Sequence, residues 1–341
     1  MTRWLGFLVC AFTALWLIGC GSDDPLSEEQ SGPSQIAFTS DRGGVLQAYV
    51  IRADGSGFLR ISHTGGQTYS PRWRPDGQVI AFTSTDSLFD FGADIYLVSP
   101  NGTGQVNLTQ TRDVFDGEPS WSPDGTRLVF VTARDNADAE IYVMSSSGTN
   151  PIRLTTNPGV DNLPRWSPSG GWIAFQSTRN DTTDLYAMKP DGFDLRRLTR
   201  THEVEYDPVW SPDGSTLAFT GGNIDSTQII IVPVSGASET PVTGGASSAR
   251  EPSWSPNGNQ IVYASDDGIH IVDRDGTDDH GISGTDRFDH YPEWSPDGRL
   301  ILFERRENNN WEVYVTAPDG AGMKNVSETP IVADRDPEWE P

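Results

Sequence analysis

Cysteine, lysine and long hydrophobic runs are all scarce in this chain, and each scarcity excludes a class of protein. The two cysteines, Cys10 and Cys20, lie at the extreme N-terminus, so the rest of the chain must be stabilised by its packed core rather than by disulfides. Only Lys189 and Lys324 are lysines, and 48 acidic residues against 24 basic ones give a net charge of −24. A surface of that sign repels nucleic acid and anionic lipid headgroups.

The one substantial apolar run, from Trp4 to Ile18, follows a single positive charge at Arg3. It is too short and too close to the N-terminus for a convincing membrane span, and this arrangement is typical of a cleaved signal peptide. The phrase Leu17-Ile18-Gly19-Cys20 resembles the lipobox of bacterial lipoproteins. That resemblance implies acylation of Cys20 and stable attachment to a bilayer, because two or three acyl chains hold where one does not.

The N-terminal region therefore divides into two predicted segments. We expect a lipoprotein signal peptide over residues 1–19 and a flexible tether over residues 20–34, which are polar, acidic and rich in Ser, Gly and Pro. Gly21 rather than Asp follows the cysteine, which in lipoproteins of two-membrane bacteria favours the outer membrane. The predicted location is the bacterial cell envelope, on the periplasmic side or at the cell surface. The alternative is a plain secretory signal with an incidental cysteine.

A seven-residue phrase close to P-x-W-S-P-D-G recurs along the rest of the chain. Its tryptophans, 40 to 48 residues apart, are Trp73, Trp121, Trp166, Trp210, Trp254, Trp294 and Trp339. Such a period is typical of an array of four-stranded blades, because one blade cannot bury both of its faces alone. The Pro and Gly favour a β-turn, and the apolar run that follows, such as Ile173-Ala174-Phe175, suits a strand packed on both faces. We expect the tryptophans to lie in the core between blades.

The number of repeats predicts how the array closes. The first blade, which starts near Gln35, lacks an innermost strand, whereas Arg335 to Glu340 supply such a strand without a blade of their own. Joining the two removes an open edge that would otherwise invite aggregation. We predict an all-β fold over residues 35–341: a seven-bladed β-propeller of four-stranded antiparallel blades, the first closed by the C-terminal strand. Six blades is the alternative if one repeat packs irregularly.

The phrases W-S-P-D-G, I-A-F-x-S and D-I-Y-x-x-x-x-D-G resemble the repeat of TolB-type propellers, and they cover nearly the whole chain after the N-terminal segment. TolB itself has an additional N-terminal α/β domain without a counterpart here and is not lipidated, so the resemblance implies a shared propeller rather than a direct ortholog. It further implies a central channel that holds cations and receives an extended partner peptide.

Acidic residues recur three positions before the first proline of the phrase. They are Asp116, Asp161, Glu205, Asp289 and Asp334, and the equivalent positions in the other two blades are Thr68 and Ala249. Radial repetition predicts a ring of carboxylates at the channel mouth. Such a ring would bind a basic peptide or a cation, with Ca²⁺ as the candidate ion. In the alternative interpretation, each acid caps its own turn or pairs with a nearby arginine.

The loop from Ser84 to Ala93 is longer than its counterparts and carries Phe89 and Phe91. Apolar side chains in an acidic loop are candidate anchors for a protein partner. The alternative is that they fold back over the edge of their own blade.

An enzymatic function is the main competing hypothesis. His63, His202 and His290 lie in loops that enter the innermost strands of three blades, and some propeller lyases acting on oligogalacturonides bind a metal through histidines on this kind of face. The chain has neither a G-x-S-x-G elbow nor a phosphate-binding P-loop. We therefore expect a non-enzymatic monomer that binds a protein or basic peptide, with a metal-dependent, lyase-like enzyme as the alternative. A purely structural spacer of envelope assemblies is a third interpretation.

Overall fold

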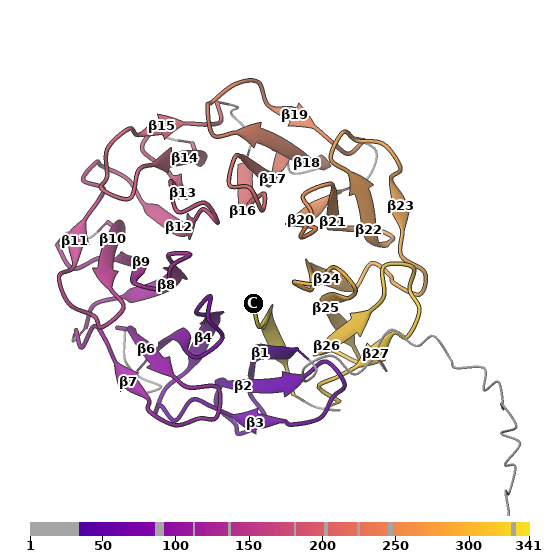
Figure 1. Ribbon diagram of the computed structural model, residues 1–341, viewed down its shortest axis with the longest axis horizontal. Coiled ribbons are helices and arrows are strands. Elements are labelled where there is room, and N and C mark those ends of the chain that lie inside the picture. Colours follow the sequence, from indigo (N-terminus) through magenta and orange to yellow (C-terminus); the bar gives the residue numbers. More distant parts are fainter. Residues whose placement is uncertain are drawn as a thin grey trace, which may run out of the picture.

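The computed structural model describes residues 34–85, 92–111, 113–135, 138–180, 182–200, 204–223, 226–244, 248–328 and 332–341. In this part of the chain, seven four-stranded antiparallel sheets stand side by side in a closed ring (Figure 1). The predicted seven-bladed propeller is therefore confirmed, and the six-bladed alternative is wrong. No helix among the described residues is long and apolar enough to cross a membrane.

Each blade runs from an innermost strand at the channel to a short outermost strand. Blade 1 consists of β28 (Asp334–Trp339), β1 (Gln35–Ser40), β2 (Gln47–Arg52) and β3 (Leu59–Arg60). Blade 2 consists of β4 (Thr68–Trp73), β5 (Ile80–Ser84), β6 (Asp94–Val98) and β7 (Val106–Asn107). Blade 3 consists of β8 (Asp116–Trp121), β9 (Arg127–Thr132), β10 (Glu140–Ser145) and β11 (Ile152–Arg153). Blade 4 consists of β12 (Asp161–Trp166), β13 (Ile173–Ser177), β14 (Asp184–Met188) and β15 (Arg196–Arg197).

The remaining blades follow the same order without interruption. Blade 5 consists of β16 (Val204–Trp210), β17 (Thr216–Asn223), β18 (Ser226–Pro233) and β19 (Thr240–Pro241). Blade 6 consists of β20 (Arg250–Trp254), β21 (Gln260–Ser265), β22 (Gly268–Asp273) and β23 (His280–Gly281). Blade 7 consists of β24 (Asp289–Trp294), β25 (Ile301–Glu307), β26 (Asn310–Thr316) and β27 (Lys324–Asn325).

The core lies between blades rather than within them. One hydrophobic cluster fills each of the seven interfaces, so every blade buries both of its faces against its neighbours. Between blades 1 and 2, for example, Val50 and Ile61 pack with Trp73 and Phe82. The seven repeat tryptophans are 3–9% exposed, as expected for core residues. The ring closes because each wedge needs two neighbours to cover its apolar faces.

The two ends of the described chain meet in blade 1. Strand β28 pairs antiparallel with β1, and beyond it the backbone N–H of Glu340 donates to the carbonyl of Gln35 at 2.8 Å. At the outer rim, Lys324 Nζ of blade 7 donates to the carbonyl of Asp54 at 2.6 Å. In Figure 1 the yellow β28 lies against the indigo β1 near the centre of the ring. The C-terminal strand therefore completes the N-terminal blade, as predicted.

All seven innermost strands carry a β-bulge at the same place. The pairing of each with its neighbour shifts register just before or at the repeat proline. The residue before that proline has a φ of 49° to 57° in every blade, although none of the seven is glycine. An extra residue in a strand re-aims the side chains on either side of it. The bulge therefore decides which residues face the channel.

Candidate functional site

A cavity of about 480 Å³ lies in the central channel, enclosed mainly by the seven innermost strands. Two sets of residues supply most of its wall. The pre-proline ring, immediately before the repeat proline, is Ser70, Glu118, Leu163, Asp207, Glu251, Tyr291 and Asp336. The post-proline ring, immediately after it, is Arg72, Ser120, Arg165, Val209, Ser253, Glu293 and Glu338. Five members of the first ring and all seven of the second line the cavity.

Hydrogen bonds from the preceding blade hold the pre-proline ring in place. Because the bulge turns the backbone amide out of the sheet, that amide needs another acceptor. The amides of Leu163, Tyr291 and Asp336 donate to carboxylates of Glu118, Glu251 and Glu304, respectively, at 2.6–2.7 Å. The amides of Glu118 and Glu251 donate in the same way to threonine hydroxyls of the blade before. Several cavity carboxylates thus have a structural task between blades.

The repeat tryptophans hold the post-proline ring. The indole Nε1–H of Trp121 donates to the carbonyl of Arg72 at 3.2 Å, and that of Trp210 donates to the carbonyl of Arg165 at 3.0 Å. The same bond joins Trp339 to the carbonyl of Glu293 at 3.4 Å. In each case the tryptophan belongs to the next blade around the ring. Three charged residues of the cavity wall are therefore anchored through the hydrophobic core.

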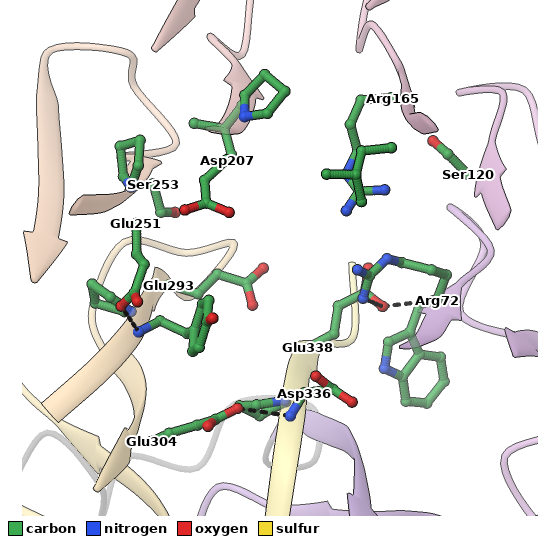
Figure 2. Close-up of a pocket in the computed structure, with 18 of the residues that line it drawn as sticks. Arg72, Ser120, Arg165, Asp207, Glu251, Ser253, Glu293, Glu304, Asp336 and Glu338 are labelled. Atoms are coloured by element: carbon green, nitrogen blue, oxygen red, sulfur yellow. Dashed lines mark hydrogen bonds and ion pairs between the residues drawn. The ribbon is translucent and has the colours of Figure 1, made fainter. Parts of the chain in front are cut away.

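The charges in the cavity are divided between two sides. Figure 2 shows Arg72 and Arg165 on one side and Asp207, Glu251 and Glu293 across the space from them. Burial in the channel, reinforced by the charge of Glu251, raises the pKa of Asp207 to about 6. Burial, reinforced by Glu338, raises the pKa of Glu293 to about 8. At neutral pH, Glu293 therefore keeps a proton that an ordinary carboxyl group loses.

Burial also shifts the pKa on the cationic side of the cavity. Burial, with repulsion from Arg72, lowers the pKa of Arg165 to about 10, so this guanidinium stays charged at neutral pH. Arg72 forms an ion pair with Glu338 at 3.7 Å. Burial raises the pKa of Glu304, deeper in blade 7, to about 8, and Asp336 adds to the effect. The cavity is thus acidic overall but not uniformly so.

Two side chains of the wall, Asp207 and Arg165, make few bonds within the described part of the chain. Asp207 has no hydrogen bond or ion pair among those residues, and Arg165 donates only to the carbonyl of its neighbour Pro164 at 3.3 Å. Glu251, Glu304 and Glu338 each accept a backbone N–H from another strand, and Glu293 accepts that of Trp339. Asp207, Glu293 and Arg165 are half-buried, so part of each side chain is accessible to a ligand in the cavity.

The five acids predicted from the sequence do not line this cavity. They are completely buried, with Glu205 1% exposed, and the four aspartates among them pair with arginines of their own blades. Asp161 receives Arg179 Nη2 at 3.1 and 3.0 Å, and Asp116 receives Arg134 Nη2 at 3.1 Å on both oxygens. Each guanidinium also lies over an aromatic pair of its blade, as Arg179 does over Phe175 and Tyr186.

Two of the other three acids have equivalent surroundings. Asp334 accepts Arg42 Nη2 at 3.0 Å on both oxygens, and Asp289 accepts two bonds of 2.7 Å from Arg305. Glu205 instead accepts from the hydroxyl of Thr199 and from the backbone N–H of Leu185, in blade 4, at 3.3 Å. The contacts of the four aspartates match the local arginine pairing considered as the alternative. The bulge accounts for this placement, because it inverts the alternation and turns these side chains away from the channel.

The two candidate histidines that the structure describes, His63 and His290, do not form a site together. His63 is exposed, and its backbone N–H donates to Gln105 Oε1 at 2.8 Å. His290 contacts Glu251 at 3.2 Å and meets Trp311 edge-on at a ring separation of 5.4 Å. Within the described ranges, no group of three or more His, Cys, Asp or Glu side chains could hold a metal ion. His202 lies outside the described residues.

Other predicted residues lie outside the part of the chain that the structure describes. Cys20 and residues 1–33, which include the predicted signal peptide and most of the tether, lie outside the described residues. The same holds for Phe89 and Phe91, the candidate partner anchors. These predictions remain untested by the fold.

Exposed apolar side chains lie on or just before innermost strands, on the face that carries the longer loops. Tyr69 and Tyr291 are 38% and 53% exposed, and Phe115, Val160 and Phe288 immediately precede innermost strands in three blades and are 38–42% exposed. The W-S-P-D-G turns and the D-G turns lie on the opposite face, where Phe193 is the most exposed of the large apolar residues. An apolar rim around a charged cavity suits a peptide better than a free ion.

Known proteins share this architecture. A family model described as the TolB beta propeller domain matches residues 90–270 and 201–341. A protein TolB homolog of Chlorobium chlorochromatii is 30% identical over 149 residues, 43% of this chain and 32% of that protein. The Tol-Pal system protein TolB of Desulfosudis oleivorans is 35% identical over 132 residues, 37% of this chain and 27% of that protein. The chain thus aligns with about a third or less of the length of these curated relatives.

The solved structures that resemble this chain include proteins with different names and activities. TolB from Acinetobacter baumannii matches with a TM-score of 0.62 at 22% identity, over 90% of this chain and 67% of that chain. An oligogalacturonate lyase in complex with manganese matches with a TM-score of 0.67 at 15% identity, over 83% of this chain and 86% of that chain. Identities this low show the common fold alone. The family model covers most of the sequence, and the chain therefore belongs to the TolB beta propeller domain family.

Proposed function

We propose that this protein is a non-enzymatic, lipid-anchored component of the bacterial cell envelope that binds a protein or peptide partner in its channel. The observation that carries the proposal is the cavity of about 480 Å³, with charged side chains inside and an exposed apolar rim around its mouth. Mixed polar and apolar walls in a concave site are typical of binding sites. The partner enters from the face with the longer loops, where the rim lies.

The relatives support an envelope role. One carries the name Tol-Pal system protein TolB, and the lipobox-like phrase that ends in Cys20 agrees with attachment to the envelope. On this proposal the acyl chains on Cys20 hold the protein at the outer membrane, and the tether up to residue 34 lets the propeller reach its partner.

Photo-crosslinking in intact cells tests where the partner binds. p-Benzoylphenylalanine replaces Tyr291 or Tyr69 at the channel mouth in separate variants, and Phe193 on the opposite face is the matched aromatic control. The proposal expects a discrete crosslinked species from both tyrosine positions, identified by mass spectrometry, and none of that species from position 193. Equal yields from both faces, or no crosslink at the mouth, would contradict it.

The lipid anchor has a separate test. Detergent phase partitioning of envelope fractions should place the parent protein in the detergent phase and the Cys20→Ala variant in the aqueous phase or the uncleaved precursor. Equal partitioning of the two mature proteins would remove the anchor from the proposal without affecting the channel site.

A further inference from the structure

The charges of the channel indicate the chemistry of its occupant. Among the cavity carboxylates, Glu251, Glu304 and Glu338 serve as acceptors for backbone N–H groups of another strand, and Glu293 accepts the backbone N–H of Trp339. Asp207 has no such task within the described residues. Asp207 and Glu293 are half-buried, line the cavity and face its centre in Figure 2. Two carboxylates in one concave site suit a cationic donor from a ligand.

Arg165, on the opposite wall of the cavity, indicates which ligand atoms it could bind. Arg165 carries five N–H donors in a fixed fork, yet its only bond within the described residues is to the carbonyl of Pro164. The backbone of Arg165 is fixed by the indole of Trp210 at 3.0 Å. A guanidinium with unused donors suits a carbonyl or carboxylate oxygen of a ligand. It repels a bare metal ion, so acidic residues alone do not describe this site.

We propose that the channel takes an extended peptide segment whose arginine or lysine side chain lies between Asp207 and Glu293, while its backbone carbonyls accept from Arg165. This inference rests on the proposed peptide-binding function and deepens it by naming the recognised chemistry. Charge-assisted bonds to two carboxylates make the basic side chain the determinant of specificity.

Proton release accompanies this recognition. Glu293 is protonated in the empty channel at neutral pH, since its pKa is about 8, and a bound cation favours the ionised form. The charged and titratable groups around it are Arg72 on β4, Arg165 on β12, Asp207 on β16, Glu251 on β20, Tyr291 on its own β24, Glu304 on β25, and Asp336 and Glu338 on β28. Affinity for the basic peptide therefore rises with pH between about 6 and 9, by at least about 10-fold.

Isothermal titration of the purified propeller with two synthetic peptides tests the inference. The probes are acetyl-Ala-Ala-Arg-Ala-Ala-amide and the same peptide with citrulline, which keeps the shape of arginine and removes its charge. The expected result is binding of the arginine peptide and at least about 10-fold weaker binding of the citrulline peptide. The Asp207→Asn and Glu293→Gln variants should each lose about 10-fold or more, whereas Asp194→Asn on the outer surface should leave the affinity unchanged.

The same titrations measure how many protons are released on binding. At pH 7, in buffers of different ionisation enthalpy, the parent protein should release up to one proton on binding, and the Glu293→Gln variant should release markedly less. Equal affinity for the two peptides, unaffected affinity in both channel variants, or absence of binding would overturn the inference. Tight binding of calcium chloride without binding of the arginine peptide would also overturn it.

These outcomes are separable from failure of the proposed function. If crosslinking at the channel mouth identifies a partner while arginine and citrulline peptides behave alike, only the cationic recognition is wrong. If no crosslink forms at the mouth, the proposed binding function itself is wrong. Circular dichroism of each variant establishes that loss of binding is not loss of folding.

Discussion

At the scale of single residues, the innermost strands carry two kinds of carboxylate that have different functions. Asp161 is completely buried and bonded to Arg179 through both oxygens, and its counterparts in blades 1, 3 and 7 repeat this pairing. Glu293 lies in the same strand, β24, as the buried Asp289, but it lines the channel cavity and pairs with no arginine within the described residues. The first kind stabilises the blades, and the second kind is available for binding.

Removing the buried pair should therefore destabilise the protein. Asp161→Asn leaves the Arg179 guanidinium, 12% exposed, with a weaker and uncharged acceptor. We expect the free energy of unfolding to fall by about 3 kcal/mol. The matched control is Asp194→Asn, in an exposed pair with Arg196, which should change the stability very little because water screens the pair. Urea denaturation measures both, and equal effects of the two substitutions would show that the buried pair has no structural role.

The raised pKa of Glu293 makes a prediction about pH. The unfolded carboxyl group loses its proton near pH 4.5, whereas the folded one keeps it up to about pH 8. The folded state binds more protons in that interval, so this group lowers the free energy of unfolding as pH rises from about 4.5 to 8. Glu293→Gln removes the effect and should be more stable than the parent at pH 9 by roughly 2–4 kcal/mol, with little difference at pH 4. Denaturation curves of both proteins at the two pH values test this. A stability difference that is the same at pH 4 and pH 9 would contradict the raised pKa of Glu293.

The limits of the sequence are also clearest at single residues. The spacing of the tryptophans was enough to predict the blades, because burial between wedges needs a large apolar residue at a fixed place. The channel wall was not predictable in the same way. Asp116 and its counterparts share strand parity with the post-proline ring, and only the bulge turns them away. A left-handed residue before proline in all seven blades has no conspicuous sequence signal, since five different residue types occupy it.

At the scale of elements, β28 is the strand on which the ring depends. It supplies the channel edge of blade 1 and carries Trp339, which is 3% exposed and packs against residues of blades 1 and 7. The sequence was sufficient to predict this closure, because the repeat count left one innermost strand without a blade. The short outer strands finish each blade with few exposed backbone groups.

Truncation of Trp339 tests that dependence. Trp339→Ala should lower the free energy of unfolding by about 3–5 kcal/mol, because it leaves a cavity between blades 1 and 7 and removes the bond to Glu293. Tyr291→Ala, at an exposed place in the neighbouring β24, is the control and should cost much less. Urea denaturation and size-exclusion chromatography provide the readouts. If Trp339→Ala is as stable as the control, closure by β28 contributes little to stability.

At the scale of the whole molecule, seven similar wedges make a ring whose centre is not symmetric. Repetition accounts for the blades, the buried acid–arginine pairs and the interblade bonds. The cavity differs, because its basic residues Arg72 and Arg165 belong to blades 2 and 4 while Asp207 and Glu293 belong to blades 5 and 7. A net charge of −24 also attracts a basic partner over distance. Recognition thus depends on what distinguishes the blades, whereas stability depends on what they share.

The most direct test of the central claim, that the partner occupies the channel, is to fill the channel and measure crosslinking at its mouth. Ser253→Trp places an indole in the post-proline ring, and p-benzoylphenylalanine at position 69 reports the partner from the far side of the ring. The account predicts that the crosslinked species disappears while the thermal melting of the propeller persists. An undiminished crosslink in the filled variant would contradict it.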